Sequence, residues 1–238
     1  MKSNNTLTFS KQSCLALVLA VLALPASAQQ PTAAERAAML KATLLASQAV
    51  LKQYEWIETT VVSLKGEEKS RKQERCYYGA DGGLQKVLLT QTAPAPQKRG
   101  FLRRKIAENK QAELTDYMKS AVALVRTYVP PSPAKIQAAK DAGKVSIDVL
   151  EPGKRARLNF RDYEKPRDNL GVEVDLVSNR PLGVKVSTYL DNAEDAVTLD
   201  VRMGQLNDGT TYPSDIVLEA KAKNVAVTVK NSGYRKAN

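Results

Sequence analysis

The sequence predicts an α+β fold in which a curled antiparallel β-sheet of about ten strands has helices on its concave face. Apolar and polar residues alternate in seven consecutive runs from Lys144 to the C-terminus, and three more strand-like runs come earlier. Helical patterns precede and interrupt these runs. Strict alternation indicates a sheet with one dry face and one wet face, which is typical of antiparallel strands.

The N-terminus has the order of a secretory signal peptide. Lys2 and Lys11 precede an apolar run at 15–24, and the small residues Ala26, Ser27 and Ala28 follow it. The run is about half of the ~20 residues that a membrane-spanning helix needs. We therefore predict a cleaved signal peptide at 1–28 and a mature protein outside the cytoplasm. Its 210 residues are enough for one domain or two small ones.

The first helix is expected at 33–52, opened by a capping box of Thr32 and Glu35. Two further helices are expected at 106–128 and 133–142, separated by Pro130 and Pro131. The early strands are expected at 54–64, 69–78 and 84–90, with glycine-containing turns between them. The run 69–78 is so polar that we predict it at a sheet edge or in a wet opening. The later strands are expected at 145–149, 156–160, 170–176, 182–190, 197–203, 216–220 and 225–229.

Catalytic patterns are scarce. The chain has no histidine, which excludes Ser-His-Asp and Cys-His catalysis and the commonest metal ligand. Ser132 and Lys135 match S-x-x-K, but Ser132 also suits a helix N-cap, with Pro133 at the first helical position and Gly143 after the last. Cys76, alone after processing, is either a free thiol or a small buried hydrophobe. We expect no enzyme, no cofactor and no metal site.

The net charge is +11, which suits an anionic partner. Secretion removes genomic DNA from consideration, so we expect no nucleic acid partner. Within the basic stretch 98–110, Arg103, Arg104 and Lys105 follow Phe101 and Leu102 and are predicted to contact anionic lipid head groups at a membrane surface. The alternative is a solvated helix flank.

The predicted sheet is larger than its helical cover. Ten strands at ~4.8 Å span about 48 Å, whereas three helices at ~8–10 Å cover about 25–30 Å. The dry face is therefore expected to enclose an apolar ligand-binding cavity, unless curvature closes it into an ordinary core. The expected lining residues share the dry face: Trp56, Leu158, Phe160, Val172, Val174, Val184, Val186, Leu199, Val201 and Leu218. For Trp56 a plain core position is an equal alternative.

Four segments resemble the periplasmic LolA/LolB lipoprotein-carrier superfamily: 54–64, 78–83, 212–216 and 227–234. The resemblance implies a periplasmic protein with a single mature domain at 29–238. This domain would be an incomplete β-barrel, or half-barrel, closed by a helical lid over an apolar cavity for acyl chains. The arginine that locks the lid in that family cannot be assigned in this sequence, because Arg71 and Arg75 both lie in the right region and no motif fixes either one. The sequence thus predicts a periplasmic carrier or binder of lipid or lipoprotein acyl chains without catalysis. The alternatives are an envelope protein-interaction or stress-sensor module with the same fold, and hydrolysis by two carboxylates in a cleft.

Overall fold

A computed structural model describes residues 33–92 and 101–237 of the chain. The chain divides into two units, Met1–Gln30 and Pro31–Asn238, and the fold below is that of the second unit. The predicted signal peptide at 1–28 and the capping residue Thr32 lie outside the described residues, so these remain predictions, as does the single mature domain at 29–238.

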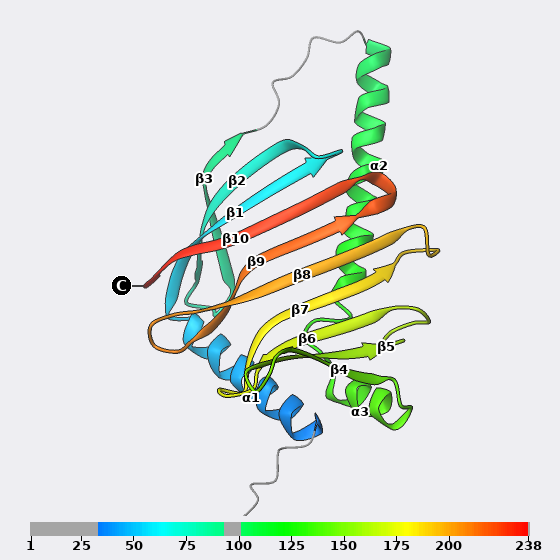
Figure 1. Ribbon diagram of the computed structural model, residues 1–238. Helices are drawn as coiled ribbons and strands as arrows, with labels where there is room; N and C mark the ends of the chain where they lie inside the picture. Colours follow the sequence, from blue (N-terminus) through cyan, green and yellow to red (C-terminus); the bar gives the residue numbers. More distant parts are fainter. Residues whose placement is uncertain (1–32, 93–100, 238) are drawn as a thin grey trace, which may run out of the picture. The chain divides into compact units, whose positions relative to one another are not determined.

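Ten strands form one antiparallel sheet in the order β3-β2-β1-β10-β9-β8-β7-β6-β5-β4 (Figure 1). The two outermost strands, β3 and β4, stand at opposite ends of this order, so the sheet is open. This confirms the predicted fold class. The strands are β1 (Tyr54–Leu64), β2 (Glu67–Tyr78), β3 (Leu84–Thr92), β4 (Val145–Glu151), β5 (Arg155–Arg161), β6 (Asn169–Asp175), β7 (Arg180–Tyr189), β8 (Ala196–Gln205), β9 (Thr211–Ala220) and β10 (Val225–Lys236).

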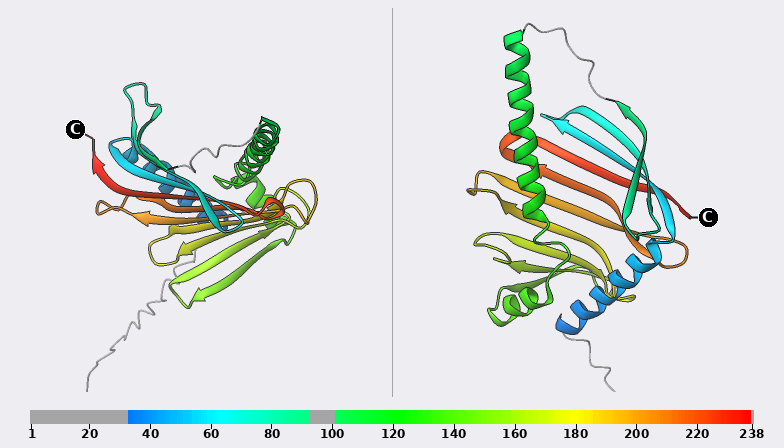
Figure 2. Two further views of the ribbon diagram at one scale, coloured as in Figure 1. Left: turned by 90° about the horizontal axis from the view of Figure 1, so that it is seen from above. Right: turned by 180° about the vertical axis from the view of Figure 1, so that it is seen from behind.

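Three α-helices in the described residues lie on one face of this sheet: α1 (Ala33–Leu51), α2 (Phe101–Val125) and α3 (Pro133–Asp141). Seen from behind, all three stand in front of the strands, and the β2–β3 end of the sheet curves towards them (Figure 2). None of the helices in the described part of the chain is both long and apolar enough to cross a membrane.

Helix α3 begins and ends where its residue types predict. Ser132 is the N-cap residue and Pro133 follows it, although the Ser132 hydroxyl makes no capping hydrogen bond. After the last turn, Gly143 has a φ of +66°, in the left-handed region that glycine adopts without strain.

The strand register aligns apolar residues in rows across the concave face. One such row runs from β4 across the sheet to β1 and takes one residue from each strand, each paired with the next. Its members are Val145, Phe160, Leu170, Val186, Leu199, Leu218, Val227 and Val62. The strands β5 to β9, the end of α2 and helix α3 contribute to one buried cluster, in which Leu170 and Ala121 are fully buried. Register is therefore specified by burial, because a slip of one residue would turn each row outward.

The polar run 69–78 was predicted at a sheet edge or in a wet opening. The edge alternative was wrong, since β2 lies between β1 and β3. Of the two edge strands, β3 exposes all nine of its residues. Although β2 is an inner strand of the sheet, its charged side chains have partners. Within the strand, Lys72 pairs with Glu74 at 3.0 Å and Arg71 with Glu68 at 2.7 Å.

Candidate functional site

Two hollows lie between the helices and the sheet. The first, here called the α1 cavity, has a volume of about 280 Å³ and lies between α1, α3, the Pro130–Pro133 turn and strands β5 to β7. Its walls are mainly apolar, and its volume is near the lower end of the ~300–1,000 Å³ typical of ligand pockets. The apolar lining includes Leu44, Leu45, Ile136, Leu158, Phe160, Val172 and Val184.

The second hollow, here called the α2 groove, has a volume of about 1170 Å³ and lies between α2 and strands β1, β2, β3 and β10. Its apolar walls come from the sheet and from one stripe of α2 at helical spacing. They include Val62, Leu64, Val225, Val227, Leu114, Met118 and Val122. This is the larger of the two spaces, and it opens where the sheet is least covered.

The C-terminal end of α2 is fixed to the sheet by a buried hydrogen-bond network. The Tyr128 hydroxyl donates to Asp168 Oδ2 at 2.5 Å and lies 2.8 Å from Thr188 Oγ1. Burial raises the pKa of Tyr128, as does its hydrogen bond to Asp168, so the hydroxyl keeps its proton and can donate. Asp168 also accepts the backbone N–H groups of Tyr163, Glu164 and Lys165. The network fixes one end of the lid.

Further along α2, two polar contacts hold the helix over the sheet. The Tyr117 hydroxyl donates to Asp195 in the β7–β8 connection. Glu113 pairs with Lys223 at 2.7 Å, and this pair lowers the pKa of Glu113. These contacts place the α2 stripe Leu114, Met118 and Val122 opposite β1 and β10, which defines the groove.

The ten residues predicted to line one cavity do not all lie in one place in the structure. Nine of them belong to the single buried cluster, and four of these nine, Leu158, Phe160, Val172 and Val184, also line the α1 cavity. The other five, Val174, Val186, Leu199, Val201 and Leu218, are buried in the core. A ligand-binding role for the set stays a prediction.

Trp56 lies apart from the other nine residues. Its ring stacks on Tyr234 with centroids 5.5 Å apart, and its Nε1 donates to Asn231 Oδ1 at 3.1 Å. Tyr78, Tyr54 and Tyr212 complete this aromatic group through contacts with Trp56 or Tyr234. The indole is 8% exposed and its polar atom is satisfied, so its position is that of a core tryptophan.

The lining of the α2 groove was missed by the sequence reasoning. The sequence predicted a helix at 106–128 but assigned no groove to it, whereas the groove uses its i, i+4 series Leu114, Met118 and Val122. That series is visible in the sequence. Its role depends on where the helix crosses the sheet, which the spacing does not state.

The basic residues are placed as follows. The side chains of Arg103 and Arg104 lie outside the described residues, and Lys105 is exposed on α2, so the head-group contact stays a prediction. Arg71 is paired with Glu68, and Arg75 with Glu55 at 3.5 Å. Neither arginine lines the α1 cavity or the α2 groove.

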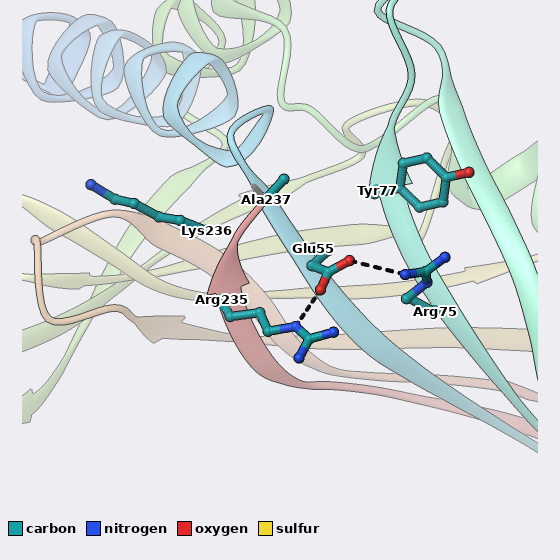
Figure 3. A pocket seen from close by; sticks show the side chains of 6 residues that line it. All are labelled: Glu55, Arg75, Tyr77, Arg235, Lys236 and Ala237. Atoms are coloured by element: carbon teal, nitrogen blue, oxygen red, sulfur yellow. Dashed lines mark hydrogen bonds and ion pairs between the residues drawn. The ribbon is translucent and has the colours of Figure 1, made fainter.

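A polar cleft of about 490 Å³ surrounds Glu55 where β10, β1 and β2 adjoin. The Glu55 carboxylate lies between the guanidinium groups of Arg75 and Arg235, and Arg75 lies 5.3 Å from the centre of the Tyr77 ring (Figure 3). Glu55, Arg75 and Tyr77 alternate along their strands with the buried Trp56 and Cys76, so they point to the outer face. Glu55 is the one carboxylate among the described lining residues, so this cleft does not supply the two carboxylates that the hydrolysis alternative requires.

A second outer-face hollow, of about 340 Å³ on β7 to β9, does hold several acids. Asp200 pairs with Lys185 at 3.2 Å and Asp215 with Lys230 at 3.7 Å. The S-x-x-K lysine is likewise engaged, because Lys135 pairs with Glu164. Within the described residues, no group of three or more Cys, Asp or Glu is arranged to hold a metal ion.

Cys76 is a free, fully buried thiol beside the aromatic group. Burial, with the nearby Glu58 carboxylate as a smaller cause, raises the pKa of this thiol to about 11. A thiol with that pKa is protonated near neutral pH and is a poor nucleophile. Cys76 therefore acts as a small hydrophobe in the folded protein.

The sequence matches no protein-family model and no curated protein. Several solved structures are similar in fold. A LolA superfamily protein from Nitrosomonas europaea is 11% identical with a TM-score of 0.34, over 84% of this chain and 94% of that one. A DUF1329 family protein from Desulfovibrio piger is 11% identical with a TM-score of 0.35, over 83% and 92%.

A third similar structure is a domain of a putative outer membrane lipoprotein-sorting protein from Vibrio parahaemolyticus. It is 12% identical with a TM-score of 0.34, over 85% of this chain and 94% of that chain. The LolA superfamily is thus present both among these structures and in the resemblance read from the sequence. Because every TM-score is below 0.5, the likeness assigns neither an activity nor a ligand to this chain.

Proposed function

We propose that this protein is a non-enzymatic periplasmic carrier or binder of lipid or lipoprotein acyl chains, which it holds in the apolar hollows between its helices and its sheet. The observation that carries the proposal is the pair of hollows on the concave face, of about 280 and 1170 Å³. A chain that occupies them gains about 0.8 kcal/mol for each buried methylene group, so useful affinity needs no catalytic chemistry.

Native mass spectrometry of the protein purified from a periplasmic extract tests the proposal, and a co-purifying lipid is the expected result. Titration with a fluorescent fatty acid is the second measurement. A protein with no co-purifying lipid and no binding of the fatty acid would reject the proposal.

A matched pair of substitutions assigns any binding to the α2 groove. Ala123 lines the groove and Ala138 is exposed on α3 outside both hollows. Ala123→Trp fills the groove at a steric cost of about 1–3 kcal/mol to a bound chain, so we expect affinity about tenfold weaker. Ala138→Trp should bind as the unmodified protein does. Equal affinity for both variants would show that the ligand does not bind in the α2 groove.

A second candidate function, contact with another envelope protein, is favoured by the edge strand β3. Its exposed apolar residues are Leu84, Val87, Leu88 and Leu89, with exposures of 40% to 53%. An unpaired apolar edge is a template for an added strand. If this surface is used, an envelope protein recovered stoichiometrically in a pull-down should be lost from the Leu88→Lys variant and retained by Val177→Lys.

A further inference from the structure

We propose that the α2 groove binds an anionic amphiphile, whose acyl chain lies along Leu114, Met118 and Val122 and whose anionic head group lies at Lys69 and Lys110. The inference rests on the proposed function and adds the chemical class of the ligand. Fatty acid carboxylates and lipid phosphates share this chemistry.

The groove lining combines polar and apolar side chains. Polar side chains from three elements contribute: Lys69 and Ser70 of β2, Gln91 of β3, and Lys110 and Gln111 of α2, with Thr115, Lys119 and Arg126 further along the chain. One turn after Lys110 the apolar stripe of α2 begins with Leu114. An amphiphile, which has one polar and one apolar end, matches this arrangement.

The charge of the groove has one sign. Four basic residues line it, Lys69, Lys110, Lys119 and Arg126, and none of the described lining residues is acidic. Among the described residues, the charge of Lys110 acts on Glu113, which lies outside the groove lining and pairs with Lys223 at 2.7 Å. A positive field beside an apolar wall attracts an anion and is poorly suited to a cationic ligand.

The partner of Lys69 does not prevent a role in head-group binding. Its ion pair with Glu67 is 2.5 Å long, but the two side chains are 41% and 75% exposed. Exposed pairs contribute little to stability. Glu67 is outside the groove lining, so Lys69 can exchange this partner for a ligand anion without burying an unpaired carboxylate.

The length of the groove fits one acyl chain. Lys110 and Arg126 are about 24 Å apart along the helix axis at ~1.5 Å per residue. An acyl chain in a membrane spans about half of a ~30 Å hydrocarbon core. A chain whose head group lies at Lys110 therefore ends before Arg126. The α1 cavity, at about 280 Å³ with Lys41 as its one charged lining residue among those described, offers less room and less charge.

The test compares cis-parinaric acid, a fluorescent fatty acid, with its methyl ester, which has the same chain and no charge. We expect the acid to bind the unmodified protein several-fold more tightly than the ester. Lys69→Gln and Lys110→Gln should each weaken binding of the acid about fivefold and leave the ester unchanged. Lys140→Gln, an exposed lysine of α3 outside both hollows, is the matched control.

Competition by palmitic acid and by palmitoyl lysophosphatidic acid then distinguishes a carboxylate from a phosphate head group, and tighter competition by either supports the inference. Equal affinity for acid and ester in the unmodified protein would overturn it while the proposed function stands. Failure of both probes to bind would overturn both proposals, and would leave a protein segment or a second copy of the chain as the occupant.

Discussion

The two ends of the sheet differ in how their concave faces are filled. At the β5–β9 end, here called the packed half, Val, Leu and Phe rows pack against the end of α2 and against α3. At the β1–β3 end, here called the open half, the same face carries ion pairs, such as Lys86 with Glu58 at 2.6 Å, and borders the α2 groove. One continuous sheet therefore carries a large apolar core at one end. At the other end it carries the smaller buried group around Trp56 and Cys76 together with a charged, partly open region.

Because of this difference, we expect the stability of the fold and the binding of a ligand to depend on different halves of the sheet. Buried rows supply most of the folding free energy, because apolar area removed from water contributes about 25 cal/mol per Å². Exposed or ion-paired positions contribute little to that sum. The open half is thus where substitutions are expected to alter ligand binding with the least effect on folding.

The largest expected contrast comes from truncating one leucine in each half. Leu170 in the packed half is fully buried, whereas Leu88 on β3 is 53% exposed. Leu170→Ala should lower the free energy of unfolding by about 2–5 kcal/mol, and Leu88→Ala by less than about 0.5 kcal/mol. Urea denaturation measures both. Similar losses for the two variants would show that the open half is packed as tightly as the other.

An intermediate effect is expected at the network that fixes α2 to the packed half. Tyr128→Phe removes the hydroxyl that donates to Asp168 and contacts Thr188. Hydrogen bonds to charged groups contribute about 1.5–3 kcal/mol, and we expect a loss of that size in the free energy of unfolding.

The control for this network is Tyr189→Phe, which deletes an exposed hydroxyl bonded to the Pro166 carbonyl at 3.0 Å. It should change the free energy of unfolding by about 0.5 kcal/mol or less. If both phenylalanine variants behave alike, the buried network does not anchor the lid.

The packed half was also the part that the sequence predicted best. Strict alternation from Lys144 onward located all seven later strands, and nine of the predicted dry-face residues lie in one cluster. Alternation reports burial directly, because one face of each of these strands is covered. The family resemblance added the lid, and the helices follow from spacing and capping residues.

The open half was predicted less well for a physical reason. Polarity alone suggested that 69–78 lies at a sheet edge or in a wet opening. The edge position is taken by β3, which contains Leu84, Val87 and Leu88. Backbone pairing of a polar strand is possible because its charged neighbours find partners: Lys86 of β3 reaches Glu58 of β1 across the intervening β2, at 2.6 Å. The α2 groove was missed because it depends on the crossing position of a helix, which is a long-range property.

The smallest expected effect concerns a link between the two halves. The Tyr54 hydroxyl, at the start of β1, donates to Asp208 Oδ2 at 2.6 Å in the β8–β9 turn. This hydrogen bond, together with those from Thr210, lowers the pKa of Asp208 to about 2. A carboxyl group of the unfolded chain titrates near ~3.9, so the link stabilises the fold above about pH 4, and the stabilisation is lost as the pH falls towards 2.

Tyr54→Phe should therefore lower the melting temperature slightly near neutral pH and make it less dependent on pH between about 4 and 2. Tyr77→Phe is the control, because the Tyr77 hydroxyl forms no hydrogen bond with any described residue and should leave that dependence unchanged. Thermal unfolding followed by circular dichroism at several pH values measures both. An unaltered acid profile in Tyr54→Phe would mean that Asp208 is held by its own turn through Thr210. The two halves would then be joined near this point by the contacts of β10 with β9, such as the Tyr212–Tyr234 ring contact, and not by the Tyr54 hydroxyl.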